Sequence, residues 1–255
     1  MKATHSAGQS EAAKTISSVL SCFNYEKEEL GISEIARELD AYPSKIYRIV
    51  ATLSQNGLLE QNPTNKKYKI GLKLFEIGSL YLTNLNVRRI VRNHALRLAK
   101  YFETDVHLGI LSKSPPYYIV IVDRFVQSDT SIQRIHFNVP PYSSALGKAI
   151  LAFLEDNLRF SIIQKLEFVK HTSSTITDGS RLEEELKLIR TRRYAYDQEE
   201  TRENLCCIGV PIRDRKSVIA ALSVSGTCKK IEKNKNKIIE ELILTSDLVS
   251  YQLGH

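Results

Sequence analysis

Apolar residues recur at helical spacing in three short stretches near the start of the sequence. In the first stretch, residues 15–23, the stripe consists of Ile16, Val19, Leu20 and Phe23. A second helix is expected to run to Leu39 with Ser33 as its N-cap. Pro43 suits the first turn of a third helix, whose stripe consists of Ile46, Ile49, Val50 and Leu53. This helix is predicted to end at Asn56-Gly57, a favourable C-cap pair, so the last two helices form a helix-turn-helix candidate.

The side chains left facing outward on the third predicted helix are polar, basic or aromatic. They are types that contact phosphates or base edges: Ser44, Lys45, Tyr47, Arg48, Thr52 and Gln55. The following stretch, LLEQNPTNKKYKIG, predicts a basic hairpin, or wing, that carries Lys66, Lys67 and Lys69. Residues 41–75 hold six basic residues and one acidic residue, a local charge of +5. A merely solvated surface is the alternative, but three helices, a wing and basic side chains in this order favour DNA binding.

Farther along the chain the pattern changes from helical to mixed. Residues 84–101 carry five basic residues and no acidic one, which predicts a connecting helix. Val91, Leu96 and Leu98 are expected to dock against another element while the arginines add non-specific attraction to DNA, and an ordinary interdomain helix is the alternative. Strands are predicted at 106–111, 117–124, 132–139, 194–200, 206–214 and 218–226, and helices at 145–154, 157–166, 181–193 and 234–253. Strands in such groups predict an α+β domain with a mostly antiparallel sheet flanked by helices.

The order of these segments resembles the isocitrate lyase regulator (IclR) family of bacterial transcription factors over almost the whole chain. The matching stretches are ISEIARELDAYPSKIYRIVATLSQNGLLE, YKIGLKLFEIG, SSALGKAILAF, TITDGSRLEEEL, RRYAYDQEE, CCIGVPIRD and IAALSVSG. One departure is Pro43, which falls one place later than the family's proline. The resemblance implies a winged helix-turn-helix domain at residues 10–78, a linker helix at 79–101 and a sensor domain at 102–255 with a GAF/profilin-like antiparallel sheet.

The resemblance also implies a DNA-binding regulator rather than an enzyme, with carboxylic or aromatic acids as typical effectors. The expected partners are double-stranded operator DNA, a small-molecule effector and further copies of the chain in a dimer or tetramer. The expected DNA contacts are Ser44, Lys45, Tyr47, Arg48, Thr52, Lys66 and Lys67. Carried over to matching positions, the effector pocket consists of Val139, Ala145, Leu146, Asp197, Leu205, Cys207, Ser223 and Ser225. Ser223 and Ser225 fall on one strand face, where exposure at a sheet edge is the alternative.

Gly147-Lys148, at a predicted helix start, resembles part of a phosphate-binding loop. Such a loop also needs an earlier glycine and a hydroxyl after the lysine, but Tyr142 and Ala149 occupy those positions. The sequence therefore excludes nucleotide hydrolysis at this turn. A loop that enters a helix still favours an anion such as a carboxylate.

The cysteines and histidines leave one alternative function open. Two of the four cysteines are adjacent, so no disulfide framework and a reducing cytoplasm are expected. Cys206 and Cys207 permit a thiol-based redox response, provided that Arg193, Arg202 or Arg213 lowers a thiol pKa. The histidines lack metal-ligand spacing, so no metal and no cofactor are expected. The net charge of +7 fits a polyanionic partner, and no membrane segment is expected.

Overall fold

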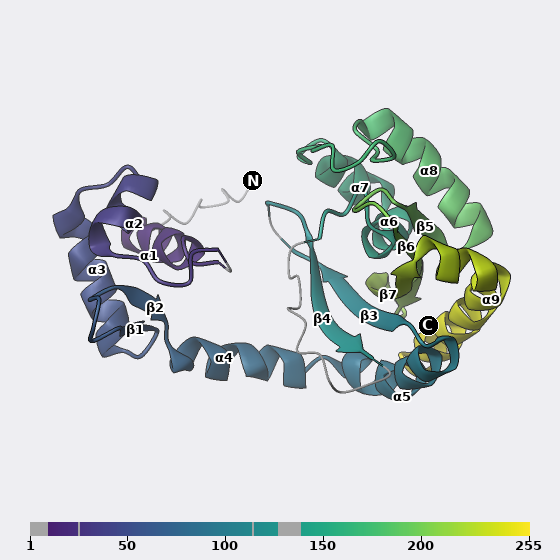
Figure 1. Ribbon diagram of the computed structural model, residues 1–255, viewed down its shortest axis with the longest axis horizontal. Helices are drawn as coiled ribbons and strands as arrows, with labels where there is room; N and C mark the ends of the chain where they lie inside the picture. The colour runs from purple at the N-terminus through teal and green to yellow at the C-terminus, as the bar shows by residue number, and fades with distance from the viewer. Residues whose placement is uncertain (1–9, 25, 114, 127–138) are drawn as a thin grey trace, which may run out of the picture. The chain divides into compact units, whose positions relative to one another are not determined.

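The structure of the protein is a computed structural model that describes residues 10–24, 26–113, 115–126 and 139–255. The chain divides into two compact units, Met1–Asn84 and Leu85–His255 (Figure 1). Among the described helices, none is long and apolar enough to cross a membrane. The strand predicted at residues 132–139 lies outside the described residues except for Val139.

The first unit consists of a three-helix core followed by a small hairpin and a further helix. Its elements are α1 (Glu11–Ser21), α2 (Ile32–Glu38), α3 (Pro43–Gln55), β1 (Leu59–Gln61), β2 (Tyr68–Ile70) and α4 (Leu72–Thr83). The two strands pair antiparallel, as the predicted wing requires. Its buried core draws on every one of the first three helices and on β1, through Val19, Ile35, Ile46, Val50, Leu53 and Leu59. The predicted helix-turn-helix is therefore confirmed.

Two predicted helix starts in this unit are wrong. The first helix begins at Glu11, with Ser10 as its N-cap, because its first turn is too polar to show in the apolar stripe. The second helix begins at Ile32 rather than after Ser33. There the N–H of Gly31 donates to Glu34 Oε2 at 2.6 Å, so the carboxylate caps the helix and no hydroxyl is needed.

The second unit is built on a five-stranded antiparallel sheet with strand order β4-β3-β7-β6-β5. Its strands are β3 (Asp105–Leu111), β4 (Ile119–Phe125), β5 (Ala195–Gln198), β6 (Leu205–Arg213) and β7 (Val218–Thr227). Its helices are α5 (Asn86–Phe102), α6 (Ala145–Ala152), α7 (Asp156–Ile163), α8 (Gly179–Arg192) and α9 (Cys228–Gln252). The α+β class and the antiparallel sheet are confirmed, although the last helix starts six residues earlier than predicted.

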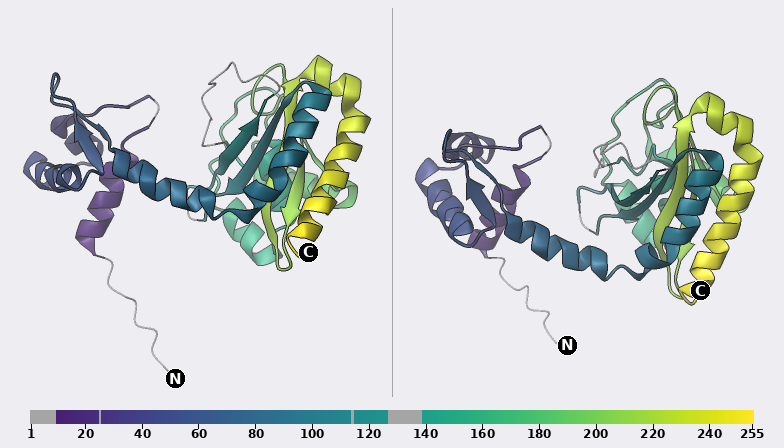
Figure 2. Two further views of the ribbon diagram at one scale, coloured as in Figure 1. Left: turned by 90° about the horizontal axis from the view of Figure 1, so that it is seen from below. Right: turned by 60° about the horizontal axis from the view of Figure 1, so that its bottom comes forward.

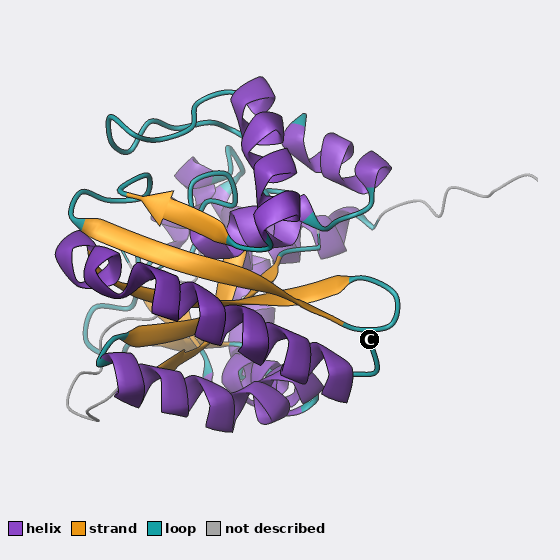
Figure 3. Ribbon diagram, turned by 90° about the vertical axis from the view of Figure 1, so that its right-hand side faces the viewer, coloured by secondary structure: helices purple, strands orange, loops and turns teal. Residues whose placement is uncertain are grey.

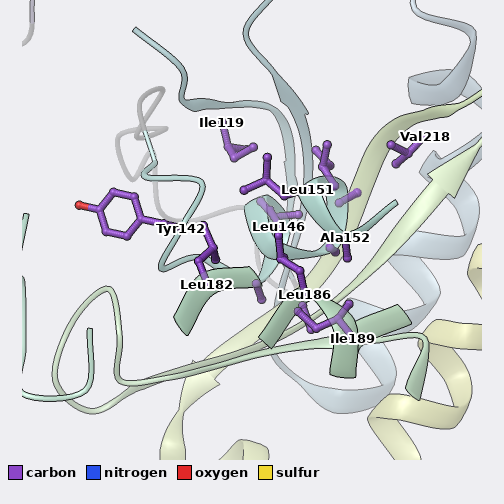
Figure 4. Close-up of a cluster of buried hydrophobic side chains, with 14 of the residues drawn as sticks. Ile119, Tyr142, Leu146, Leu151, Ala152, Leu182, Leu186, Ile189 and Val218 are labelled. Atoms are coloured by element: carbon purple, nitrogen blue, oxygen red, sulfur yellow. The ribbon is translucent and has the colours of Figure 1, made fainter. Parts of the chain in front are cut away.

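Helices cover both faces of this sheet. The long helices α5 and α9 lie side by side over one face (Figures 2 and 3). On the other face, α6 lies so close to β6 that a Cβ added to Gly209 would come within 2.8 Å of the carbonyl oxygen of Ala145. Leu146 and Leu151 of α6 pack in one buried cluster with Leu182 and Leu186 of α8, which forms the outer layer (Figure 4). The sheet therefore separates a face covered by α5 and α9 from a face covered by α6.

The helix α5 docks onto the sheet instead of standing free. Its buried residues are Val87, Val91, Ala95, Leu98, Ala99 and Phe102, whereas the predicted docking residue Leu96 is exposed. Arg88 pairs with Asp123 at 2.9 Å, and Arg97 pairs with Glu241 at 2.8 Å. Two of the arginines in this basic stretch thus serve contacts within the second unit.

Candidate DNA-binding and effector sites

The exposed face of α3 carries most of the side chains predicted to contact DNA. Pro43 at the first helical position starts the helix, and burial of Ile46, Val50 and Leu53 turns its opposite side outward. Ser44, Tyr47, Arg48 and Thr52 are exposed. Because Ser44, Arg48 and Thr52 are four residues apart, they lie on one side of the helix.

Two predicted DNA-contacting lysines have partners within the domain. Lys67 Nζ lies 2.8 Å from Glu34 Oε1, and Lys45 Nζ lies 3.9 Å from Glu11 Oε1. Lys66 is exposed, with a backbone φ of 61° at the end of the wing turn. Arg48 forms no ion pair with any of the described residues. Arg48 and Lys66 are therefore the predicted cations that are free to meet phosphate or bases.

Tyr42 is a candidate contact that the sequence reasoning missed. It is the N-cap of α3, and 82% of it is exposed. Tyrosine is enriched at interfaces because it combines an apolar ring with a hydroxyl group. The feature of the sequence that could have identified Tyr42 is its position directly before Pro43, at the start of the helix.

The register of the sheet brings four predicted effector residues together on the face that α6 covers. In one row across the strands, Asp197 lies opposite Cys207, which lies opposite Ser225. In the neighbouring row, Gly209 lies opposite Ser223, which lies opposite His107. Directly opposite residues point to the same face, and so do residues two apart on one strand.

The amino end of α6 lies over these two rows. Ser144 caps this helix, accepting a hydrogen bond from the N–H of Gly147 at 3.1 Å. Among the described residues, the N–H groups of Ala145 and Leu146 have no partner, although both residues are buried. A buried helix end with unpaired N–H groups favours an anion.

Val139 and Leu205, the two predicted apolar walls, lie at different places. Val139 pairs with Ile119 in an isolated bridge and packs against the cluster that contains Ala145 and Leu146. Leu205 begins β6, two residues before Cys207, and is half-buried. Leu205 therefore shares the strand face of Cys207, whereas Val139 approaches α6 from beside β4.

The serine pair is buried, so the alternative of solvent exposure is excluded. Among the described residues Ser223 makes no side-chain hydrogen bond, whereas Ser225 Oγ lies 3.3 Å from His107 Nδ1. His107 is a second residue that the sequence reasoning missed, since only the register places it beside the serines. Burial lowers the pKa of His107 to about 4, so its ring is neutral near pH 7. Next to it, Arg124 pairs with Asp105 at 2.5 Å.

Asp197 is engaged in the turn that follows β5. It accepts hydrogen bonds from the N–H of Glu200 and from the Thr201 hydroxyl, each at 2.8 Å. Burial raises its pKa, while these donors and Lys148 act in the opposite direction. Asp197 therefore organises the turn as well as bordering the row that contains Cys207.

Lys148 of the Gly147-Lys148 turn has a structural role and does not bind phosphate. Its side chain is fully buried, and Nζ donates to the carbonyl of Tyr196 at 2.6 Å and forms an ion pair with Glu200. Burial raises the pKa of Glu200 to about 7, against the attraction of Lys148. A lysine held in this way does not reach a nucleotide phosphate, which agrees with the exclusion drawn from the sequence.

The environments of Cys206 and Cys207 do not favour the redox alternative. Cys206 forms a disulfide with Cys228 at the start of α9, so the expectation that no disulfide would form is wrong. Cys206 and Cys207 point to opposite faces of β6, and burial raises the pKa of Cys207 well above its usual value. Arg202 acts in the opposite direction but does not outweigh burial, so Cys207 lacks the activated thiolate on which the alternative depended.

Comparison with known proteins decides the family. Residues 16–63 match the IclR helix-turn-helix domain, and residues 79–251 match the domain described as bacterial transcriptional regulator IclR C-terminal. The chain belongs to the IclR family of bacterial transcriptional regulators. It is 32% identical over 248 residues to the HTH-type transcriptional regulator KdgR of Escherichia coli K12, a match that covers 94% of each protein.

Solved structures of the IclR family agree with this membership. The crystal structure of the Thermotoga maritima IclR is 29% identical, with a TM-score of 0.66 over 96% of this chain and 97% of that one. An IclR homolog from Microbacterium hydrocarbonoxydans, crystallised with 4-hydroxybenzoate, is 22% identical, with a TM-score of 0.78 over 95% and 98%. The chain is thus a DNA-binding regulator with a ligand-binding C-terminal domain, and not an enzyme.

The buried ion pair of Lys148 generates a testable prediction. Lys148→Met should destabilise the protein by about 3–5 kcal/mol, because Glu200 and the carbonyl of Tyr196 would lose their buried donor. Adding Glu200→Gln should restore part of the loss, since an amide carries no charge. The free energies of unfolding of the two variants and the parent are measured by urea denaturation.

The control is Lys187→Met, which removes an exposed lysine from α8 and should leave the unfolding midpoint unchanged. A Lys148→Met variant as stable as this control would contradict the role given to the ion pair.

Proposed function

We propose that this IclR-family regulator binds operator DNA through α3 and the wing, and that a small carboxylic or aromatic acid bound beneath α6 changes its affinity for the operator. The observation that carries the effector proposal is the buried amino end of α6 with the unpaired N–H groups of Ala145 and Leu146. The proposal concerns the ligand class, the contact residues and the oligomer.

The DNA contacts follow from the free groups on α3 and the wing. Arg48 would read base edges in the major groove, with Tyr47, Lys45 and Thr52 beside it. Lys66 would reach a backbone phosphate, and Lys67 would do so after leaving Glu34. Ser44 lies in the first turn of α3, where a hydroxyl suits a phosphate.

The effector class follows from the groups that face α6. The two N–H groups suit a carboxylate, and the free Ser223 hydroxyl suits either a carboxylate or a hydroxyl on the ligand. Cys207 and the partly buried Val139 would contact an apolar body. The M. hydrocarbonoxydans homolog with 4-hydroxybenzoate supports an aromatic acid as one member of this class.

A dimer is supported by α4. Its apolar residues Leu72, Phe75, Ile77, Leu80 and Tyr81 are all exposed, and the helix contains no buried residue. A helix that is apolar on several sides needs a partner surface. We propose that α4 packs against a second copy, which would present two α3 helices to a pseudo-palindromic operator.

Regulation then requires only that the acid favours one arrangement of the dimer over another. A coupling free energy of about 1–3 kcal/mol changes operator affinity by about 5- to 150-fold. The redox alternative through Cys206 and Cys207 is disfavoured, because Cys206 pairs with Cys228 and burial raises the pKa of the Cys207 thiol.

Arg48→Ala should weaken operator binding by roughly 1–3 kcal/mol and relax sequence preference, because a base contact is lost. Lys66→Asn should weaken binding to all sequences and reduce the salt slope by about one unit, and asparagine tolerates the positive φ. Electrophoretic mobility shifts at several salt concentrations measure both effects. Arg181→Ala, which removes an exposed charge from α8, should bind like the parent. If Arg48→Ala also binds like the parent, α3 is not the reading helix.

Leu80→Asp should shift the protein from dimer toward monomer, because a carboxylate would be buried in the α4 contact. Leu80 is 62% exposed in the single chain, so the fold itself should tolerate the change. Sedimentation velocity measures the shift. The matched control is Leu188→Asp on α8, where the leucine is 58% exposed. Equal sedimentation of the two variants and the parent would refute pairing through α4.

Small carboxylic and aromatic acids, 4-hydroxybenzoate among them, should raise the thermal midpoint of the parent. An acid at 100 times its Kd stabilises the folded state by about 2.7 kcal/mol. Ser223→Ala should reduce this stabilisation while leaving operator binding without acid unchanged. Ser217→Ala, in the exposed turn before β7, is the control and should respond like the parent. If acids raise the thermal midpoint of Ser223→Ala as much as that of the parent, Ser223 is not part of the effector site.

A further inference from the structure

A hollow in the C-terminal domain lies apart from the residues of the proposed effector site. This cavity has a volume of about 440 Å³, and its walls come from the ends of α6 and α8, the end of β6 and the last turns of α9. None of the eight predicted effector residues lines it. It therefore requires an explanation of its own.

The cavity arises where the sheet loses its edge strand. Strand β5 pairs with β6 only as far as Gly209, and no other described strand pairs with the rest of β6 on that side. Two serines of α9 replace the missing partner: Ser246 donates to the carbonyl of Pro211 at 2.5 Å, and Ser250 accepts from the N–H of Arg213 at 3.0 Å. A helix lies farther from a strand than a neighbouring strand does, which leaves a hollow beside this edge.

Arg213 contributes a positively charged side chain to the cavity wall. Its guanidinium carbon lies 4.0 Å from the centre of the Phe153 ring. Within the described part of the chain, this guanidinium takes part in no ion pair, whereas Arg193 on another wall pairs with Asp247. Burial, followed by repulsion from Arg193, lowers the pKa of Arg213, while attraction from Asp247 acts in the opposite direction. A partly buried guanidinium without a carboxylate is ready to bind an anion.

Part of the remaining wall is apolar and accessible. Leu244 is 50% exposed, and Leu248 and Tyr251 beside it on α9 are exposed as well. A hydrated inorganic anion would leave these side chains in water, whereas a ligand with an apolar body would cover them. The charge and the apolar wall together favour one amphipathic ligand.

We propose that this cavity is a second ligand site, which binds a small aromatic carboxylate with its carboxylate on Arg213 and its ring against Leu244 and Leu248. The site is separate from the one beneath α6. A ligand bound here would touch Phe153 at the carboxyl end of the same helix.

The test is a titration of the full-length protein, labelled with ¹³C at its leucine and isoleucine methyl groups, with 2-naphthoate. The methyl signals of Leu244 and Leu248 should move and saturate, whereas those of Leu146 report on the site beneath α6. Arg213→Met should weaken the response of Leu244 and Leu248 by about tenfold or more, the cost of one charge-assisted contact. The neutral analogue 2-naphthamide should bind the parent as weakly as 2-naphthoate binds this variant.

Two further variants test whether the response depends on the cavity: one is a control, and the other changes the cavity wall. Lys216→Met removes an exposed charge from the turn after β6 and should bind like the parent. Leu244→Glu places a carboxylate at an exposed position on the cavity wall, and it should repel the ligand without disturbing the fold.

Three outcomes would overturn the proposal. The first is a response confined to Leu146, and the second is a response that survives both Arg213→Met and Leu244→Glu. The third is a shift of the Leu244 signals with protein concentration in the absence of ligand, which would mean that a second copy covers this wall.

Discussion

The sensor domain depends on one buried cation. Lys148 extends from the first turns of α6 to the carbonyl of Tyr196 in β5 and to Glu200 in the turn beyond it. An uncompensated ammonium in this place would be prohibitively costly, so α6, β5 and the turn must fold together. The same turn is organised by Asp197, whose carboxylate accepts from the N–H of Glu200. The position of α6 over the sheet, and with it the proposed effector site, thus follows from a lysine that binds no ligand.

This arrangement also explains why small residues occur where α6 meets the sheet. At Gly209 a side chain would collide with the carbonyl of Ala145, and at Gly147 it would collide with the backbone of Pro141. Close approach brings the helix end over the serines of β7. The glycine of Gly147-Lys148 therefore permits packing, and the lysine neutralises buried carboxylates, whereas in a phosphate loop both residues would face a nucleotide.

Local signals in the sequence predicted much of the fold and part of the sites. Pro43 and the stripe of α3 were sufficient to predict the helix-turn-helix, and the grouping of β-rich runs was sufficient to predict the antiparallel sheet. Information that depends on partners distant in sequence was missed. His107 lies beside Ser225 only because β3 pairs with β7. Cys206 forms a disulfide with Cys228, which is 22 residues away in the sequence. Spacing could not show that Lys67 pairs with Glu34 or that Leu96 faces solvent, because each depends on which side of an element packs inward.

The two proposed ligand sites share one helix, which would couple them physically. α6 has eight residues and is therefore only about 12 Å long. Its amino end lies at the proposed acid site, and Phe153, directly after its last turn, lines the second cavity. A buried helix of this length, fixed by Lys148, moves as a unit rather than bending. A ligand that favours one position of α6 therefore acts on both ends, and by linkage each ligand would change the affinity of the other by the same factor.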